Sequence, residues 1–196
     1  MRSTKRCFTA SGNGAAGKTM PSGSTHDSIT ILLAVPAFAA AYAATKSVSA
    51  STVVAAAFIF GGVMFGPDLD TVSRQYSRWG IFRGIWFPYR SFFKHRSRFS
   101  HGLLFGALFR TIYFMGILTL VLYLAAFAYA WLAGGRTASV FDVAHVWQPF
   151  GEFTRRGLGD NFLLLTFTGL WLGAASHTLT DMAGSFVKTG RVTDFL

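Results

Sequence analysis

Apolar residues gather along the chain in four long runs that polar segments separate. The runs cover residues 28–45, 50–66, 102–133 and 161–180, and Arg110 is the one charged residue inside them. A helix needs about 17–25 residues to cross the hydrocarbon core of a bilayer, so the first two runs are short but adequate and the third is more than sufficient. Pro36, in the first run, is tolerable in a helix packed among neighbours. The pattern predicts an all-α, polytopic membrane protein with about four transmembrane helices.

Composition agrees with this prediction. The chain has 196 residues, of which 52% are hydrophobic and 13% charged, against about 25% charged in an ordinary soluble domain. Buried helices of a soluble protein are a poorer explanation, because the apolar runs are long and nearly free of charge. Arg110 is expected near a membrane interface, with the two preceding turns projecting past it.

The distribution of Lys and Arg predicts the orientation of the helices. With four spans, both termini and the loop 67–101 lie on one side, which then carries thirteen basic residues against four on the other. Basic loops favour the cytoplasm. The thirteen are Arg2, Lys5, Arg6, Lys18, Arg74, Arg78, Arg83, Arg90, Lys94, Arg96, Arg98, Lys188 and Arg191, and the four are Lys46, Arg136, Arg155 and Arg156. We expect a protein of the bacterial plasma (inner) membrane with cytoplasmic termini, or of an organellar membrane if residues 1–19 are a transit segment.

The N-terminal segment contains a match to a nucleotide-binding motif. The stretch "GNGAAGKT", Gly12–Thr19, fits the P-loop pattern G-x-x-x-x-G-K-[ST]. A P-loop works only between a buried strand and a helix, whereas a polar, basic stretch precedes this one, and Pro21 and Gly23 follow it. We therefore predict no nucleotide at Gly12–Thr19 and interpret residues 1–19 as a disordered or dispensable extension. Residues 20–182 then form the four-helix membrane domain, and residues 183–196 a C-terminal tail.

Histidine and acidic side chains form four clusters beside the apolar runs. Traced through the predicted topology, all four clusters fall at the cytoplasmic ends of the helices. The clusters are His26 and Asp27, Asp68 and Asp70, His95 and His101, and His177 and Asp181. Scattered surface residues would seldom gather at one membrane face in this way.

The spacing within these clusters permits metal binding. His177 and Asp181 are four residues apart, so on a helix both project from one face. Asp68 and Asp70 alternate in an extended turn, which leaves Leu69 to point back toward the bilayer. Imidazole and carboxylate together suit Zn²⁺, Mn²⁺ or Fe²⁺, and a carboxylate-rich set can hold two ions. We therefore expect one or two divalent metal ions at the cytoplasmic face.

Each cluster taken alone also has a structural explanation. Asp-Leu-Asp is a common acidic turn, His26 and Asp27 could cap the first helix, and His177 and Asp181 could be a hydrogen-bonded pair. The coincidence of four clusters at one face favours the metal site. His145 lies in the opposite loop and is interpreted as an ordinary surface histidine.

The loop from Ser73 to Phe99 interleaves aromatic residues with arginines. In a soluble protein such a loop would suggest nucleic-acid binding by stacking and phosphate contacts. Beside a membrane, aromatic side chains at the interface and arginines toward lipid headgroups are the simpler explanation, so we predict no nucleic-acid partner. Arg96 is the candidate for binding a phosphate or carboxylate of a substrate, or else a structural partner of Asp68 or Asp70.

Several longer motifs resemble a known family. "MPSGSTHDSIT", "FGPDLD", "RWGIFRGIWFPYR", "HRSRFSHG" and "SHTLTD" are similar to a bacterial family of uncharacterised metal-binding integral membrane proteins that is frequent in cyanobacteria. "PDLD" and the His-Arg-Ser…Ser-His pattern are also similar to membrane-bound metal-dependent hydrolases. The resemblance implies a metal site at His26, Asp27, Asp68, Asp70, His95, His101, His177 and Asp181.

Two functions follow as hypotheses. The first is a metal-dependent hydrolase at the cytoplasmic membrane face, acting on a phosphoester or an anionic lipid. Its direct ligands would be Asp68, Asp70, His101 and His177, with Asp27 added by the resemblance. His26, His95 and Asp181 would bind the metal, orient its ligands or act as the general base. The second is a non-catalytic metal-binding protein with a structural, carrier or assembly role.

Overall fold

The computed structural model describes residues 23–92, 102, 105–134 and 140–189, and the described residues form helices joined by turns. Four long apolar helices appear where the hydrophobic runs predicted them. Short helices fill the segment between the second and third. In chain order the elements are α1 (Gly23–Thr45), α2 (Val48–Val63), η1 (Pro67–Asp70), α3 (Arg74–Arg78), η2 (Gly80–Trp86), α4 (Phe87–Phe92), α5 (Phe105–Gly134), α6 (Val140–Leu158) and α7 (Phe162–Thr189).

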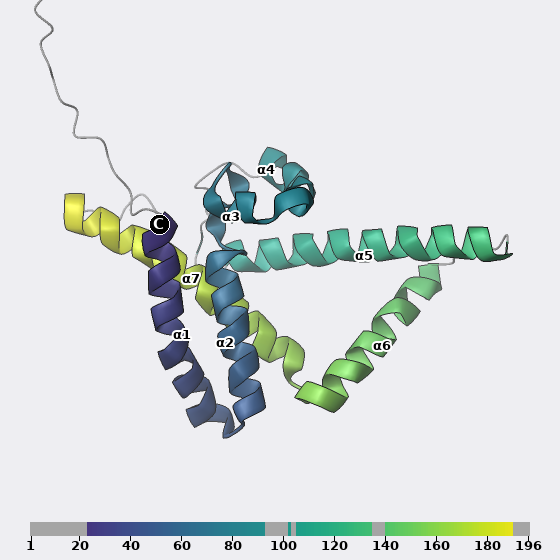
Figure 1. Cartoon of the computed structure of the whole chain (residues 1–196), viewed down its shortest axis with the longest axis horizontal. Helices are drawn as coiled ribbons and strands as arrows, with labels where there is room; N and C mark the ends of the chain where they lie inside the picture. The colour runs from purple at the N-terminus through teal and green to yellow at the C-terminus, as the bar shows by residue number, and fades with distance from the viewer. Residues whose placement is uncertain (1–22, 93–101, 103–104, 135–139, 190–196) are drawn as a thin grey trace, which may run out of the picture.

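The helices α1, α2 and α7 form the packed part of the molecule (Figure 1). A tight turn joins α1 to α2, where Lys46 has a positive φ of 55° and the Ser47 hydroxyl accepts a hydrogen bond from the Ala50 amide. Glycines let α7 approach α2 closely. A Cβ on Gly169 would lie 2.5 Å from the Val54 carbonyl oxygen, and one on Gly173 would lie 2.0 Å from that of Phe58. This small-residue packing, typical of helices in membranes, fixes α7 one turn before His177.

Three helices are long and apolar enough to cross a membrane, namely α1, α5 and α7. The fourth apolar helix, α2, has 16 residues and is therefore about 24 Å long, shorter than the roughly 30 Å hydrocarbon core. Large side chains on α1 face outward, with Leu32 72% exposed, which is consistent with a lipid-facing surface. In Figure 1, α5 begins beside one end of α2 and runs away from α1 and α2 in a different direction, rather than alongside them. The structure therefore does not show the four apolar helices side by side.

A further helix occupies the segment that the sequence pattern left as a loop. Residues 140–158 form α6, which runs from the far end of α5 toward the start of α7 (Figure 1). Its apolar and polar residues separate to opposite sides, the pattern of a helix lying on an apolar surface. The low overall hydrophobicity of these residues hid the helix from a search for membrane spans.

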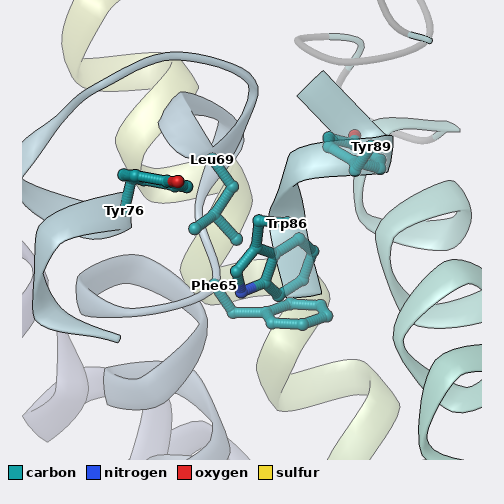
Figure 2. Packing of buried hydrophobic residues seen from close by; sticks show 5 residues of the cluster. All are labelled: Phe65, Leu69, Tyr76, Trp86 and Tyr89. Atoms are coloured by element: carbon teal, nitrogen blue, oxygen red, sulfur yellow. The ribbon is translucent and has the colours of Figure 1, made fainter. Parts of the chain in front are cut away.

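The described part of the loop rich in aromatic residues and arginines, residues 73–92, folds into a compact cap over one end of α2. Phe65, Leu69, Tyr76, Trp86 and Tyr89 form its buried cluster (Figure 2), in which Leu69, Trp86 and Tyr89 have no exposed surface. The expectation that this loop anchors its aromatic residues in lipid is therefore wrong for Trp86 and Tyr89. Leu69 likewise packs in protein instead of pointing toward the bilayer. Other residues of the loop, Ile81, Phe82, Phe87 and Phe92, remain exposed.

Arg110, in the second turn of α5, lies against this cap. It is 2% exposed, and Tyr89 and Asp70 are among the groups that interact with it electrostatically. Burial raises the pKa of the Tyr89 hydroxyl. Arg110 is thus enclosed in protein, and its place near a membrane interface stays a prediction. A buried arginine needs compensating partners, and the cap supplies them.

Candidate metal centre

Two histidines and two carboxylates meet where α1, η1 and α7 converge. His26 comes from the first turn of α1, and Asp68 from the short helix η1. His177 and Asp181 lie one turn apart on α7, on the same face, as their spacing predicted. His26, His177 and Asp181 offer ligand atoms that all lie within 4.8 Å of one another. The structure thus brings together residues from three of the four predicted clusters.

The distances within this group suit metal ligands, and the contact between His26 and Asp181 is also short enough for a hydrogen bond. His26 Nε2 lies 3.1 Å from Asp181 Oδ1, while His177 Nε2 lies 3.4 Å from Asp68 Oδ2 and 3.8 Å from Asp181 Oδ2. Ligands bound tetrahedrally at 2.0–2.1 Å from one ion are about 3.3 Å apart. The donor set, two imidazoles and two carboxylates, is also one that Zn²⁺, Mn²⁺ or Fe²⁺ accepts. The residues present therefore fit a divalent ion.

Burial makes an ion at this place more plausible still. His26, His177 and Asp181 are buried, and His26 Nδ1 and His177 Nε2 have no hydrogen-bond partner in the described part of the chain. The buried Thr30 hydroxyl, one turn after His26 on α1, also has no hydrogen-bond partner among the described residues. Buried polar atoms without partners are rare in folded proteins, and a bound ion or water is the usual explanation.

Gln75, in α3, ties η1 to α2 and α7. Its Oε1 accepts a hydrogen bond from the Asp68 amide at 3.2 Å, and its Nε2 donates to the Gly62 carbonyl at 2.8 Å. The same Nε2 lies 3.1 Å from His177 Nδ1. It donates to Nδ1 when the ring carries its proton on Nε2. The opposite amide orientation, which would accept from Nδ1–H when Nε2 binds a metal, would lose the hydrogen bonds to the Asp68 amide and the Gly62 carbonyl. Gln75 thus controls the orientation of His177, and the sequence patterns did not single it out.

Asp27 and Asp70 are placed differently from the other predicted ligands. Both carboxylate oxygens of Asp27 accept hydrogen bonds from Arg78, whose Nη1 also donates to the Val63 carbonyl at 2.8 Å. The Asp27 carboxylate raises the pKa of the Arg78 guanidinium by this hydrogen bond. Asp70 is buried beneath the aromatic cap and interacts with Arg110. Neither belongs to the group around His177, although Asp27 lies near it.

Three other predicted site residues, His95, Arg96 and His101, lie outside the described residues. His145, which was interpreted as a surface histidine, is exposed, and its Nδ1 lies 3.1 Å from Gln148 Oε1 on α6.

A pocket of about 140 Å³ opens beside the metal centre. Asp68 and His177 form one part of its wall, together with Gln75, while Arg74, Arg78 and Asp27 form the other. His26 and Asp181 do not line it, so they lie on the buried side of the centre. The centre is therefore open on one side, which is the arrangement of catalytic rather than structural metal sites.

Together, the fold and the site define an all-helical protein with helices suited to a membrane and a candidate His–Asp metal centre. The profile of a family described as uncharacterised metal-binding protein (DUF2227) matches residues 21–191. The chain belongs to this family, and the predicted resemblance to uncharacterised metal-binding proteins is confirmed. No curated protein and no solved structure matches the chain. The family description and the group of His26, His177 and Asp181 agree on metal binding.

Proposed function

We propose that this protein is a metal-dependent hydrolase that works at the cytoplasmic face of a membrane. The observation that carries the proposal is the open side of the metal centre. Asp68 and His177 belong both to the ligand group and to the wall of a pocket large enough for a small ligand group. A centre that served structure alone would be closed by protein on every side.

In this proposal His26, His177 and Asp181 of the ligand group bind one divalent ion, which leaves its side toward Asp68 and the pocket open to water. The ion supplies Lewis acidity, which activates water near neutral pH and polarises the substrate. His26 and Asp181 hold it from the buried side. Gln75 orients His177, and Asp68, which reaches the pocket, accepts the proton of the attacking water. Asp27 also lines the pocket, but Arg78 occupies both of its carboxylate oxygens.

The predicted residues outside this group keep secondary roles. Asp70 and His101 are proposed to hold a second ion if two are present, with His95 as an additional base and Arg96 as a contact for substrate. The membrane is proposed to be the bacterial plasma membrane, with both termini in the cytoplasm, as the distribution of basic residues favours.

Turnover tests the proposal directly. Purified full-length protein, reconstituted in nanodiscs and loaded with Zn²⁺ or Mn²⁺, is assayed against a panel of phosphoesters and carboxylic esters. We expect hydrolysis that a chelator abolishes and that His177→Ala lacks. Protein that holds stoichiometric metal and yet hydrolyses nothing on the panel would contradict the hydrolase assignment.

A specific observation also favours a non-catalytic role. Through His26, Asp68, His177 and Asp181, one ion would join α1, η1 and α7, which are distant in sequence. Metal binding would then stabilise the fold. This alternative predicts the same metal content and thermal stabilisation by metal, but no turnover on the panel.

A further inference from the structure

Two arginines line the same pocket as Asp68 and His177. Arg74 and Arg78 come from α3, where their spacing of four residues places both on one face of the helix. Any group that enters the pocket therefore meets guanidinium groups and the metal centre at the same time.

The two guanidinium groups differ in what they already bind. Arg78 is committed to Asp27 and to the Val63 carbonyl, so its charge is largely neutralised. Arg74 is exposed and makes no ion pair within the described residues. Its side chain packs over Gly23, where an added Cβ would lie 2.6 Å from Arg74 Cδ. The absence of a side chain at position 23 lets Arg74 lie along the pocket.

Charge decides the class of ligand. The carboxylates near the pocket are those of Asp27, Asp68 and Asp181, which carry three negative charges. A divalent ion and two arginines carry four positive charges, so the net charge is +1. With metal bound, the pocket is thus positive and favours an anion.

Size and shape narrow the class further. The pocket volume of about 140 Å³ corresponds to four or five waters at about 30 Å³ each, which suits a tetrahedral oxyanion and excludes a whole lipid. A wider, open hollow of about 560 Å³ continues over α3, and Arg74 and Arg78 line it together with Val72, Ser73 and Ser77. The rest of a ligand can extend there.

We propose that this pocket binds a phosphoryl group, with Arg74 as the residue that binds it beside the metal centre. The inference rests on the proposed metal site and names the substrate class of that site. A planar guanidinium donates two parallel hydrogen bonds to phosphate oxygens, which accounts for an arginine at this position.

Binding of inorganic phosphate to metal-loaded, full-length protein in detergent tests the proposal by calorimetry. We expect saturable binding that Arg74→Gln weakens about tenfold or more, since a charge-assisted hydrogen bond is lost. Arg74→Lys should weaken phosphate binding less, because lysine keeps the positive charge but cannot donate the two parallel hydrogen bonds of a guanidinium. Gly23→Ala, which displaces Arg74, should resemble Arg74→Gln. Arg83→Gln, which removes an exposed arginine outside the pocket, is the matched control and should bind as the wild type does.

The metal content of every variant separates the two proposals. Wild type without metal would overturn the metal site itself. Wild type with stoichiometric metal, but with phosphate binding that is absent or unaffected by Arg74→Gln, would overturn the phosphoryl pocket alone. Phosphate binding lost in Arg74→Gln, without turnover of any ester, would support the pocket and contradict only the hydrolase assignment.

Binding to lipid vesicles distinguishes a lipid headgroup from a water-soluble phosphate compound as the source of the phosphoryl group. Metal-loaded protein in micelles is mixed with vesicles of phosphatidylcholine alone or with added phosphatidic acid. Dependence of vesicle binding on both phosphatidic acid and Arg74 would identify a lipid headgroup. If Arg74 were needed for binding free phosphate but not for binding vesicles, the ligand would be a water-soluble phosphate compound. If neither vesicle binding nor phosphate binding depended on Arg74, the proposal would be overturned.

Discussion

His26 and His177 lie ring against ring, with centroids 3.9 Å apart and planes within 14° of parallel. They belong to the first and the last of the long helices, so this contact closes the packed part of the fold. Asp181 lies beside both rings. The stack holds two imidazoles in fixed positions beside one carboxylate.

Removal of either α7 ligand should abolish metal binding. In His177→Ala and Asp181→Asn we expect the metal content of purified protein to fall from about one equivalent to near zero, because each removes a buried ligand. Mass spectrometry of the eluted metal, with protein quantified in parallel, measures this. His145→Ala changes an exposed histidine on α6 and is the control. Full metal content in both α7 variants would contradict the site.

Asp27→Asn should leave metal bound and lower stability instead. The substitution removes the negative charge and one of the two hydrogen bonds with which Arg78 joins α3 to α1, in a partly exposed pair worth about 1–2 kcal/mol. We expect unchanged metal content and a lower midpoint in thermal unfolding of the detergent-solubilised protein. A loss of metal as complete as in His177→Ala would instead make Asp27 a ligand, as the sequence resemblance implies.

The contrast between Asp27 and its neighbour His26 shows where sequence reasoning reached its limit. The apolar runs identified α1, α2, α5 and α7, because hydrophobic length is a local property. Clustering of scarce polar residues identified His26, Asp68, His177 and Asp181. Which residue of an adjacent pair turns toward the metal depends on helix rotation, and that is set by tertiary contacts such as the Arg78 ion pair.

Two other features of the fold can be recognised in the sequence. Gly169 and Gly173 form a G-x-x-x-G pattern that marks a close helix contact, and α6 has the period of an amphipathic helix. Gln75 had no such signal, because a glutamine between polar residues is unremarkable until the fold places it between Asp68 and His177.

Gln75→Ala should weaken metal binding without abolishing it. The variant loses the contacts that hold the Asp68 amide and the His177 ring, and loss of such orienting partners typically costs about 10- to 100-fold in metal affinity. Competition with a chelator of known affinity measures the change. Metal content at saturating Zn²⁺ should remain near wild type. An affinity equal to wild type would show that Gln75 does not orient the ligand.

Metal removal should destabilise the fold. An ion present at 100 times its dissociation constant stabilises the folded state by about 2.7 kcal/mol, and here it would link α1, η1 and α7. We expect a chelator to lower the unfolding midpoint of wild type and to leave that of His177→Ala unchanged. An equal shift in both proteins would mean that the chelator acts elsewhere.

Gly173→Ala should disturb the metal centre from a distance. The added methyl group would lie 2.0 Å from the Phe58 carbonyl oxygen, so α7 must move away from α2 and carry His177, one turn further on, with it. Overpacking of this kind costs about 1–3 kcal/mol, and the displaced ligand should also lower metal affinity. Gly116→Ala on α5 is the matched control, because nothing lies within 4 Å of its added Cβ, and it should match wild type in unfolding midpoint and metal content. If Gly173→Ala behaved like Gly116→Ala in both measurements, the close contact between α2 and α7 would not be what positions the site.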